Sequence, residues 1–305
     1  MQQAAQQPQL SGILVVDKPA GFTSFDVVAK MRGICGTRKI GHGGTLDPMA
    51  TGVLPVFVGA AVKAVDLAPR QDKCYEATVL FGVATDTGDV TGAVVAQQDV
   101  AIDEAALKAV LPRFLGKQSQ LPPLYSAVKV NGRPLYRYAR AGETVQRKPR
   151  EVEIHALELL GAAGENRFVL RVHCGKGTYV RTLAEDIGAA LGAPATLAAL
   201  RRTAAGVFTL EQAHTLEAIQ AAKDARALPE MVRPVGSLFT PLPAHALQPG
   251  EAQKLLNGVQ LCGQSGAPGL YALYVGGQFA GLGQLDANGV LRGKKMFIGR
   301  EEAGR

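Results

Sequence analysis

The sequence predicts a fold that mixes α-helices and β-strands, with a small β-rich domain at its C-terminal end. The chain has 305 residues, which is room for about two domains of ordinary size. Between residues 11 and 240, short apolar runs rich in β-branched residues alternate with stretches of helical apolar spacing. Prolines at positions 229, 234, 241, 243 and 249 then form a passage typical of a domain junction. We therefore expect a larger domain over residues 11–240 and a smaller one over 244–305, after a disordered, glutamine-rich tail at residues 1–10.

Strands and helices follow one another closely in the first part of the chain. Residues 11–17 form a short apolar run that predicts a buried strand ending at Lys18-Pro19. Thr23 or Ser24 can cap the helix that follows, which is expected to extend to Gly33. The next expected elements are strands at residues 53–58 and 73–81, with a helical stretch at 59–67 between them.

Helices and strands are also expected through the rest of the chain. Residues 103–115 predict a helix that Pro112 kinks or shortens, and Asn131-Gly132 predicts a hairpin turn. Residues 152–160 and 168–174 look like paired strands. The remaining expected elements are a helix that opens at residues 175–182 and ends at Gly192, a strand at 196–203, a helix near 216–222, and strands at 270–275 and 278–285.

The charge of the chain favours a polyanionic partner. Lys and Arg exceed Asp and Glu by 33 − 26 = 7, and the pI is about 9.3. The excess is concentrated within residues 120–150, where seven cations face Glu143 alone: Lys129, Arg133, Arg137, Arg140, Arg147, Lys148 and Arg150. Tyr125, Tyr136 and Tyr138 interleave with these cations, a mixture that fits RNA contact. A solvated basic face with tyrosines in the core is the alternative interpretation.

Several classes of protein and site are disfavoured by the pattern of motifs. The four cysteines are isolated, which predicts reduced thiols in a cytoplasmic protein rather than a zinc site or a disulfide framework. No apolar run is long enough to span a bilayer. Asp86 and Asp89 lack the further ligands of an EF-hand, and the run from Gly175 to Thr178 lacks the upstream glycines of a Walker motif. We therefore expect no metal, no cofactor and no membrane partner.

The most informative stretch is residues 41–55, GHGGTLDPMATGVLP. Asp47 is the only acidic residue between Val27 and Val65, a region that carries five cations. Several glycines allow tight backbone geometry, and Pro48 biases Asp47 toward an extended conformation, so this carboxylate is expected on a shaped loop before a strand. A turn initiated by Asp47-Pro48 is the simpler explanation for the dipeptide alone.

The motifs of this chain resemble those of the TruB family of tRNA pseudouridine synthases. Residues 41–52 fill the family pattern Gly-His-x-Gly-x-Leu-Asp-Pro-x-Ala-x-Gly. Other matching motifs occur in the family's order between about residues 12 and 205: Lys18-Pro19 with Thr23-Ser24, the strand with Tyr75, residues 123–129, residues 176–181, and Leu200-Arg201-Arg202. Residues 244–305 resemble, more loosely, the small PUA-type RNA-binding domain of that family.

The resemblance implies both a fold and a reaction. The fold would be of the mixed α+β class, with a mainly antiparallel central sheet flanked by helices, instead of the doubly wound sheet that alternating helices and strands suggest by themselves. The reaction would be isomerisation of uridine to pseudouridine at position 55, in the T loop of tRNA. Because the target base lies within a folded loop, it must be flipped out before it can react.

The resemblance also implies roles for individual residues. Asp47 would be the nucleophile, attacking either the ribose or the uracil ring, and Arg181 would hold it ionised. Tyr75 would pack on the target uracil and is a candidate for proton transfer. His42, Tyr179 and Leu200 would contact the substrate. Ordinary structural roles are the alternatives: a strand tyrosine for Tyr75, a loop-bracing hydrogen bond for His42, a core side chain for Leu200 and, for Arg181, a surface ion pair with Glu185.

The implied partner is the T arm of tRNA, not DNA, and the implied state is a monomer. Two other functions remain open at this point. The chain could be an RNA-binding or RNA-folding module in which Asp47 has no chemical role, or a synthase for another uridine site. The presence of Asp47, Arg181 and Tyr75 together argues against a binding module.

Overall fold

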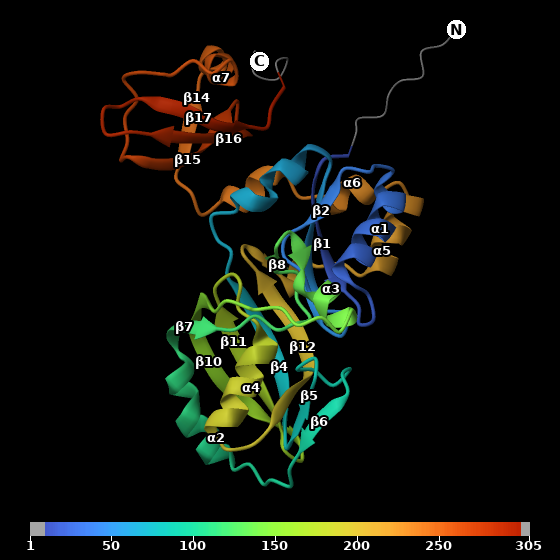
Figure 1. Ribbon diagram of the computed structural model, residues 1–305. Coiled ribbons are helices and arrows are strands. Elements are labelled where there is room, and N and C mark those ends of the chain that lie inside the picture. The colour runs from blue at the N-terminus through green and yellow to red at the C-terminus, as the bar shows by residue number, and fades with distance from the viewer. Residues whose placement is uncertain (1–9, 300–305) are drawn as a thin grey trace.

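Figure 1 shows the protein, a computed structural model that describes residues 10–299. The expected N-terminal tail at residues 1–10 lies outside the described residues, except for Leu10. The described part of the chain contains no helix long and apolar enough to cross a membrane.

A nine-stranded sheet forms the centre of the larger part of the molecule. Its main path is β1 (Gly12–Lys18), β3 (Thr51–Val58), β12 (Ala195–Ala205), β4 (Lys73–Phe81), β11 (Arg167–Cys174), β10 (Arg150–Gly164) and β7 (Gly116–Gln120), with β2 (Ile40–His42) paired to β3 and β13 (Phe208–Thr209) to β12. Every pairing in this sheet is antiparallel except β3 with β12. The expected mainly antiparallel sheet is therefore confirmed. A separate two-stranded sheet pairs β5 (Val83–Thr85) with β6 (Val94–Gln97).

Local sequence signals explain where the helices begin and end. Helix α1 (Ser24–Cys35) starts with a capping box between Thr23 and Asp26 and ends at Gly36, which has the left-handed φ of 62° that favours glycine. The predicted shortening of the helix at 103–115 is confirmed: α2 (Glu104–Val110) gives way to the 3₁₀ turn η2 (Leu111–Phe114) because Pro112 cannot continue the hydrogen-bond ladder. Outside the basic segment and the C-terminal sheet, the remaining helices are η1 (Gly59–Leu67), α4 (Val180–Ala190), η3 (Leu210–Gln212), α5 (Leu216–Asp224), α6 (Leu228–Met231) and η4 (Val235–Phe239).

The basic segment, residues 120–150, crosses in front of the sheet (Figure 1). It contains the predicted hairpin, formed by β8 (Lys129–Val130) and β9 (Arg133–Pro134). Asn131 and Gly132 both have positive φ, 50° and 76°, as a two-residue hairpin turn requires. Helix α3 (Leu135–Arg140) follows directly and was not predicted.

A second sheet of four strands follows the proline-rich passage. It is built from β14 (Ala244–Leu247), β15 (Gly269–Val275), β16 (Gln278–Leu285) and β17 (Leu291–Met296), with helix α7 (Pro249–Leu256) beside it. Apolar side chains of this sheet, such as Ala272 and Leu282, join a cluster with Ile13 and Phe57 from β1 and β3 of the large sheet. The two sheets are thus connected by a continuous apolar contact.

Candidate active site

Asp47 lies on the loop between β2 and β3, at the one parallel junction of the large sheet. At that junction Gly52 pairs with Arg202 of β12. A Cβ atom on Gly52 would lie 2.2 Å from the Arg202 carbonyl oxygen, and its φ is 100°, so only glycine fits there. The loop therefore turns next to β12. The side chain of Asp47 on this loop is 31% exposed.

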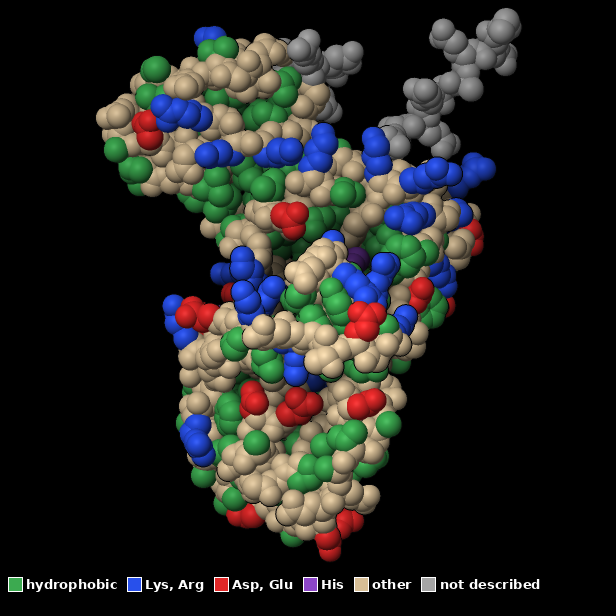
Figure 2. All heavy atoms as spheres, viewed as in Figure 1, with side chains coloured by type: hydrophobic (Ala, Val, Ile, Leu, Met, Phe, Trp, Pro, Cys, Tyr) green, Lys and Arg blue, Asp and Glu red, His purple; other side chains and the backbone are tan. Residues whose placement is uncertain are grey.

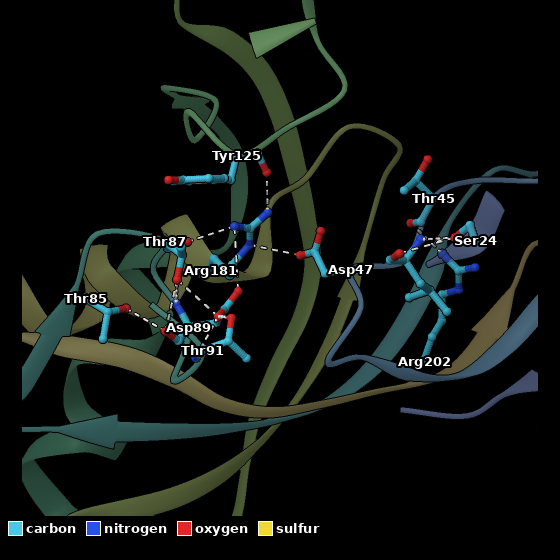
Figure 3. A network of polar contacts seen from close by, with 11 residues as sticks. Ser24, Thr45, Asp47, Thr85, Thr87, Asp89, Thr91, Tyr125, Arg181 and Arg202 are labelled. Carbon is cyan, nitrogen blue, oxygen red and sulfur yellow. Dashed lines mark hydrogen bonds and ion pairs between the residues drawn. The ribbon is translucent and has the colours of Figure 1, made fainter. Parts of the chain in front are cut away.

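The guanidinium of Arg181 lies beside the Asp47 carboxylate and points toward it (Figure 3). Its Nε lies 2.9 Å from Oδ2 of Asp47. Its Nη1 donates to the carbonyl of Thr87 and its Nη2 to the carbonyl of Tyr125, both at 2.8 Å. The side chain is 5% exposed, so these charge-assisted bonds are largely shielded from water. The guanidinium thus ties the Asp47 loop to two other loops, and its close ion-pair partner is Asp47, not Glu185.

A second carboxylate completes this arrangement. Asp89 is 4% exposed, and its Oδ2 lies 3.8 Å from Nη1 of Arg181. Oδ1 of Asp89 accepts hydrogen bonds from Thr87 and from both the backbone and the hydroxyl of Thr91. Sequence reasoning missed this residue, which was considered only as part of a metal loop. The Asp-Thr-Gly-Asp pattern of residues 86–89 signals a turn and says nothing of the arginine it faces.

Three polar side chains fix the backbone of the Asp47 loop. The amine of Lys18 donates to the carbonyl of Pro48 at 3.2 Å. The hydroxyl of Ser24 accepts from the N–H of Leu46 at 2.9 Å and bonds its carbonyl at 3.2 Å. Arg202 donates to the carbonyls of Val53, Gly44 and Thr45, at 2.7, 3.1 and 3.4 Å. Lys18 and Arg202 are both fully buried, so their bonds brace the loop from inside the protein.

A pocket of about 240 Å³ opens beside Asp47 and Arg181. Tyr75, Tyr179 and Leu200 all line it, so the structure brings together five of the six residues singled out in the sequence. Tyr75 is on β4, where alternate residues face the core, and it pairs across strands with Arg202. Leu200 lies two residues before Arg202 on β12, so the two side chains are on the same face of that strand. The backbone of Tyr179 is held at both its N–H and its carbonyl by the side chain of Gln120.

His42 is placed differently from the other five. It lines a larger groove of about 700 Å³ that is continuous with the pocket through Asp47 and Arg181. Its Nδ1 is buried and has no hydrogen-bond partner within residues 10–299. Burial and the nearby Arg202 charge lower the pKa of His42, so the ring is neutral at pH 7.

Burial dominates the electrostatics of the site. It raises the pKa of Asp47, and Asp89 adds to that effect, while Arg181 and Lys18 oppose it. It also raises the pKa of the Tyr75 phenol, against the opposing charge and hydrogen bond of Arg202. Burial lowers the pKa of Lys18 to about 8. The cations thus limit, without removing, the tendency of the Asp47 carboxyl group to hold a proton.

Some cations of the basic segment contact other residues of the same segment. Arg133 forms a 2.8 Å ion pair with Glu143, and its guanidinium lies 4.4 Å from the ring centroid of Tyr138. Arg147 donates to the carbonyl of Pro122 at 3.0 Å. Arg137 and Arg140 are exposed. Figure 2 shows Lys and Arg gathered over the middle and upper part of this face, with acidic side chains more frequent below.

Within the described residues, no group of three or more His, Cys, Asp or Glu side chains is arranged to hold a metal ion. What the pocket offers is an ordered carboxylate, a buried phenol and a guanidinium. These groups suit nucleophilic attack on a planar base or on its sugar.

Comparisons with known proteins agree with this chemistry. Residues 32–180 match the model of the TruB family pseudouridylate synthase N-terminal domain, and residues 181–240 match that of the tRNA pseudouridylate synthase B C-terminal domain. The chain is 46% identical to tRNA pseudouridine synthase B of Azoarcus sp. (strain BH72), over 97% of this chain and 98% of that protein. It is 48% identical to the protein of the same name from Burkholderia mallei (strain NCTC 10247), over 83% of each.

A solved structure shares the fold as well as part of the sequence. The crystal structure of a Cbf5-Nop10-Gar1 complex contains a chain that superposes with a TM-score of 0.73 at 26% identity, over 96% of this chain and 87% of that one. Identity of this extent over nearly the whole length, together with the family models, places the chain in one family. This protein belongs to the TruB family of pseudouridylate synthases.

Proposed function

We propose that this protein is a tRNA pseudouridine synthase that isomerises the uridine at position 55, in the T arm. The observation that carries the proposal is the 2.9 Å pair between Asp47 and the buried Arg181 at the edge of a pocket that Tyr75 also lines. The proteins named tRNA pseudouridine synthase B supply the class of substrate. The T arm as the site of action extends this from the motifs of the sequence.

The geometry suggests how the site works. A uridine flipped from its loop enters the pocket, at a cost of about a few kcal/mol that stacking and charge contacts offset. Arg181 orients the carboxylate of Asp47 toward it, so attack on the ribose or on the uracil ring starts from a fixed geometry. The N1–C1′ bond breaks, the uracil turns, and C5 bonds to C1′. The bond to Asp47 breaks, which restores the carboxylate, while the proton of C5 leaves and N1 gains one. The product is an isomer of the substrate, so no group is added or lost.

Tyr75 is suited to two roles in this reaction. Its buried, neutral phenol is suited to packing against the uracil ring. If it accepts the proton of C5, the nearby charge of Arg202 would stabilise the resulting phenolate. Tyr179 and Leu200 would form the apolar walls that keep the base in place.

The setting of the enzyme follows from the same features. Asp47, Arg181 and Tyr75 all come from one chain, which supports a monomer as the active unit. All four cysteines are free, which supports action in the reducing cytoplasm. The four-stranded C-terminal sheet would act as the PUA-like RNA-binding part.

An Asp47→Asn variant tests the proposal. It should bind a T-arm stem-loop with an affinity within about threefold of the parent, because the side chain keeps its size, yet form no pseudouridine. Pseudouridine is mapped in transcribed tRNA after incubation without added metal or cofactor. Turnover by this variant would refute the nucleophile assignment. Binding without turnover by the parent would favour an RNA-binding module.

A further inference from the structure

The groove next to the pocket is larger than a single base requires. It has a volume of about 700 Å³, against about 240 Å³ for the pocket. The two share the side chains of Asp47, Ser126 and Arg181. An RNA strand that delivers its base into the pocket must therefore lead its neighbouring nucleotides along this groove.

One wall of the groove carries an unusual side chain. Phe25 lines it and is 65% exposed, and no other Phe or Tyr within residues 10–299 falls in the exposed class. It is the second residue of α1, whose other apolar side chains Val27, Val28 and Met31 are buried. The guanidinium of Arg32 lies 5.9 Å from its ring centroid. An exposed phenyl ring beside a cation offers a free face to a planar partner.

A second aromatic side chain that lines the groove repeats this combination. Tyr136 lines the groove from α3, and the guanidinium of Arg140 lies 5.6 Å from its ring centroid. The N–H of Tyr136 donates to the carbonyl of Ser126 at 3.1 Å, which fixes the helix against the wall of the groove. Aromatic rings beside guanidinium groups are the surfaces on which single-stranded RNA stacks its bases.

Two polar atoms in the groove point to the same kind of occupant. The hydroxyl of Ser126 and Nδ1 of His42 are buried and find no hydrogen-bond partner in the described part of the chain. Both residues line the groove. A buried polar atom normally has a partner, so an occupant with hydrogen-bonding edges suits this site better than an apolar one. A nucleotide supplies both a flat face and polar edges.

We propose that Phe25 and Tyr136 form a stacking site for the base of a second unpaired nucleotide, a direct neighbour of the target uridine. Ser126 and His42 turn their unpaired polar atoms toward the groove to bond the polar edge of this nucleotide. The site orders the strand on one side of the pocket and so helps to keep the target uridine flipped out. The identity of the RNA rests on the proposed function, whereas the presence of a stacking site rests on the groove.

A fluorescent base measures this contact directly. 2-Aminopurine is placed, in separate T-arm stem-loops, at each unpaired nucleotide adjacent to the target, and each RNA is mixed with the full-length protein carrying Asp47→Asn so that no product forms. Stacking on Phe25 should quench the fluorescence at one of these positions. Adding Phe25→Ala should remove at least half of that quenching, and Phe25→Tyr should restore it. The exposed ring makes no core contact, so circular dichroism should show an unchanged melting temperature.

Kinetics on the enzyme with Asp47 intact provide a second readout. Phe25→Ala should raise KM about tenfold, the value expected for loss of one base stack, and change kcat less than about twofold. The matched control is Val94→Ala, which shortens a 61% exposed side chain on β6 outside the groove and should leave KM unchanged.

The outcomes separate this proposal from the proposed function. Equal quenching and equal KM for the parent and Phe25→Ala would overturn the stacking site while leaving pseudouridine formation intact. A parent protein that forms no pseudouridine would overturn the proposed function, and the quenching of bound RNA would still decide the stacking site. Quenching lost equally in Val94→Ala and Phe25→Ala would also overturn it, because the effect would not be specific to the groove.

Discussion

The exchange of Arg181 for lysine tests the geometry of the active site most directly. The guanidinium contacts Asp47, the carbonyl of Thr87 and the carbonyl of Tyr125, at 2.9, 2.8 and 2.8 Å. A lysine amine keeps the charge but cannot reach all three acceptors from one position. We expect it to move away from Asp47, toward the two carbonyls and Asp89, which leaves the carboxylate without its fixed orientation.

The size of the effect follows from the bond that is lost. A hydrogen bond to a charged group contributes about 1.5–3 kcal/mol. If that amount is lost mainly from the transition state, the single-turnover rate falls by about one to two orders of magnitude, at about 1.4 kcal/mol per factor of ten. Affinity for RNA should change less than about threefold, because Arg181 is only 5% exposed and its charge is retained.

Release of tritium from uridine labelled at C5 measures the rate, with enzyme in excess over a T-arm stem-loop. The control is Arg171→Lys, since the exposed side chains of Arg171 and Glu158 pair at 3.1 Å and neither residue lines the pocket. A rate within threefold of the parent, with a correctly folded variant, would refute the idea that Arg181 orients the nucleophile. A large loss in RNA affinity would show instead that its main contact is with the substrate.

Three further results are expected. The single-turnover rate should fall as the pH drops through the pKa of Asp47, and this decline should occur above the range of an ordinary aspartate, because the ionised form attacks and burial raises that pKa. Asp89→Asn should shift the decline to lower pH, since the charge of Asp89 also raises the pKa of Asp47. It should also slow the reaction about tenfold, because a neutral amide would replace the carboxylate that faces Arg181. Replacing the exposed Arg137 and Arg140 by glutamine should weaken RNA binding and reduce the slope of log affinity against log salt by about 1 to 2.

Specific outcomes would contradict each of these. An acid limb at the usual pH of an aspartate would show that Asp47 is not desolvated when RNA is bound. An unchanged limb in Asp89→Asn would mean that the two carboxylates do not interact. For the arginines, Arg171→Gln is a control, since the exposed Arg171 is paired with Glu158 and lines neither the pocket nor the groove. An equal loss of slope in this variant would mean that binding responds to total charge rather than to the basic segment.

Local sequence patterns predicted much of the fold. The alternation at residues 73–81 identified β4 and placed Tyr75 on it, because the period of a strand is visible in a single segment. Thr23 and Asp26 marked the start of α1, and Asn131-Gly132 marked the hairpin, because caps and tight turns depend on a few adjacent residues. Helix α7 and strands β14 and β17 were missed, since their short segments carry no strong periodicity.

The sequence by itself determined which residue is the candidate nucleophile, because a lone carboxylate within a glycine-rich, basic loop is legible without a structure, and the family motif names it. Only the tertiary structure decided how Asp47 is held. In the sequence, Lys18 and Arg202 were only members of family motifs and Asp89 was only part of a rejected metal loop, yet the fold buries all three around the Asp47 loop. Arg202 bonds a carbonyl 149 residues away, and Arg181 bonds one 94 residues away. Contacts between such distant residues arise only when the sheet brings β3, β4 and β12 together, and no local pattern encodes them.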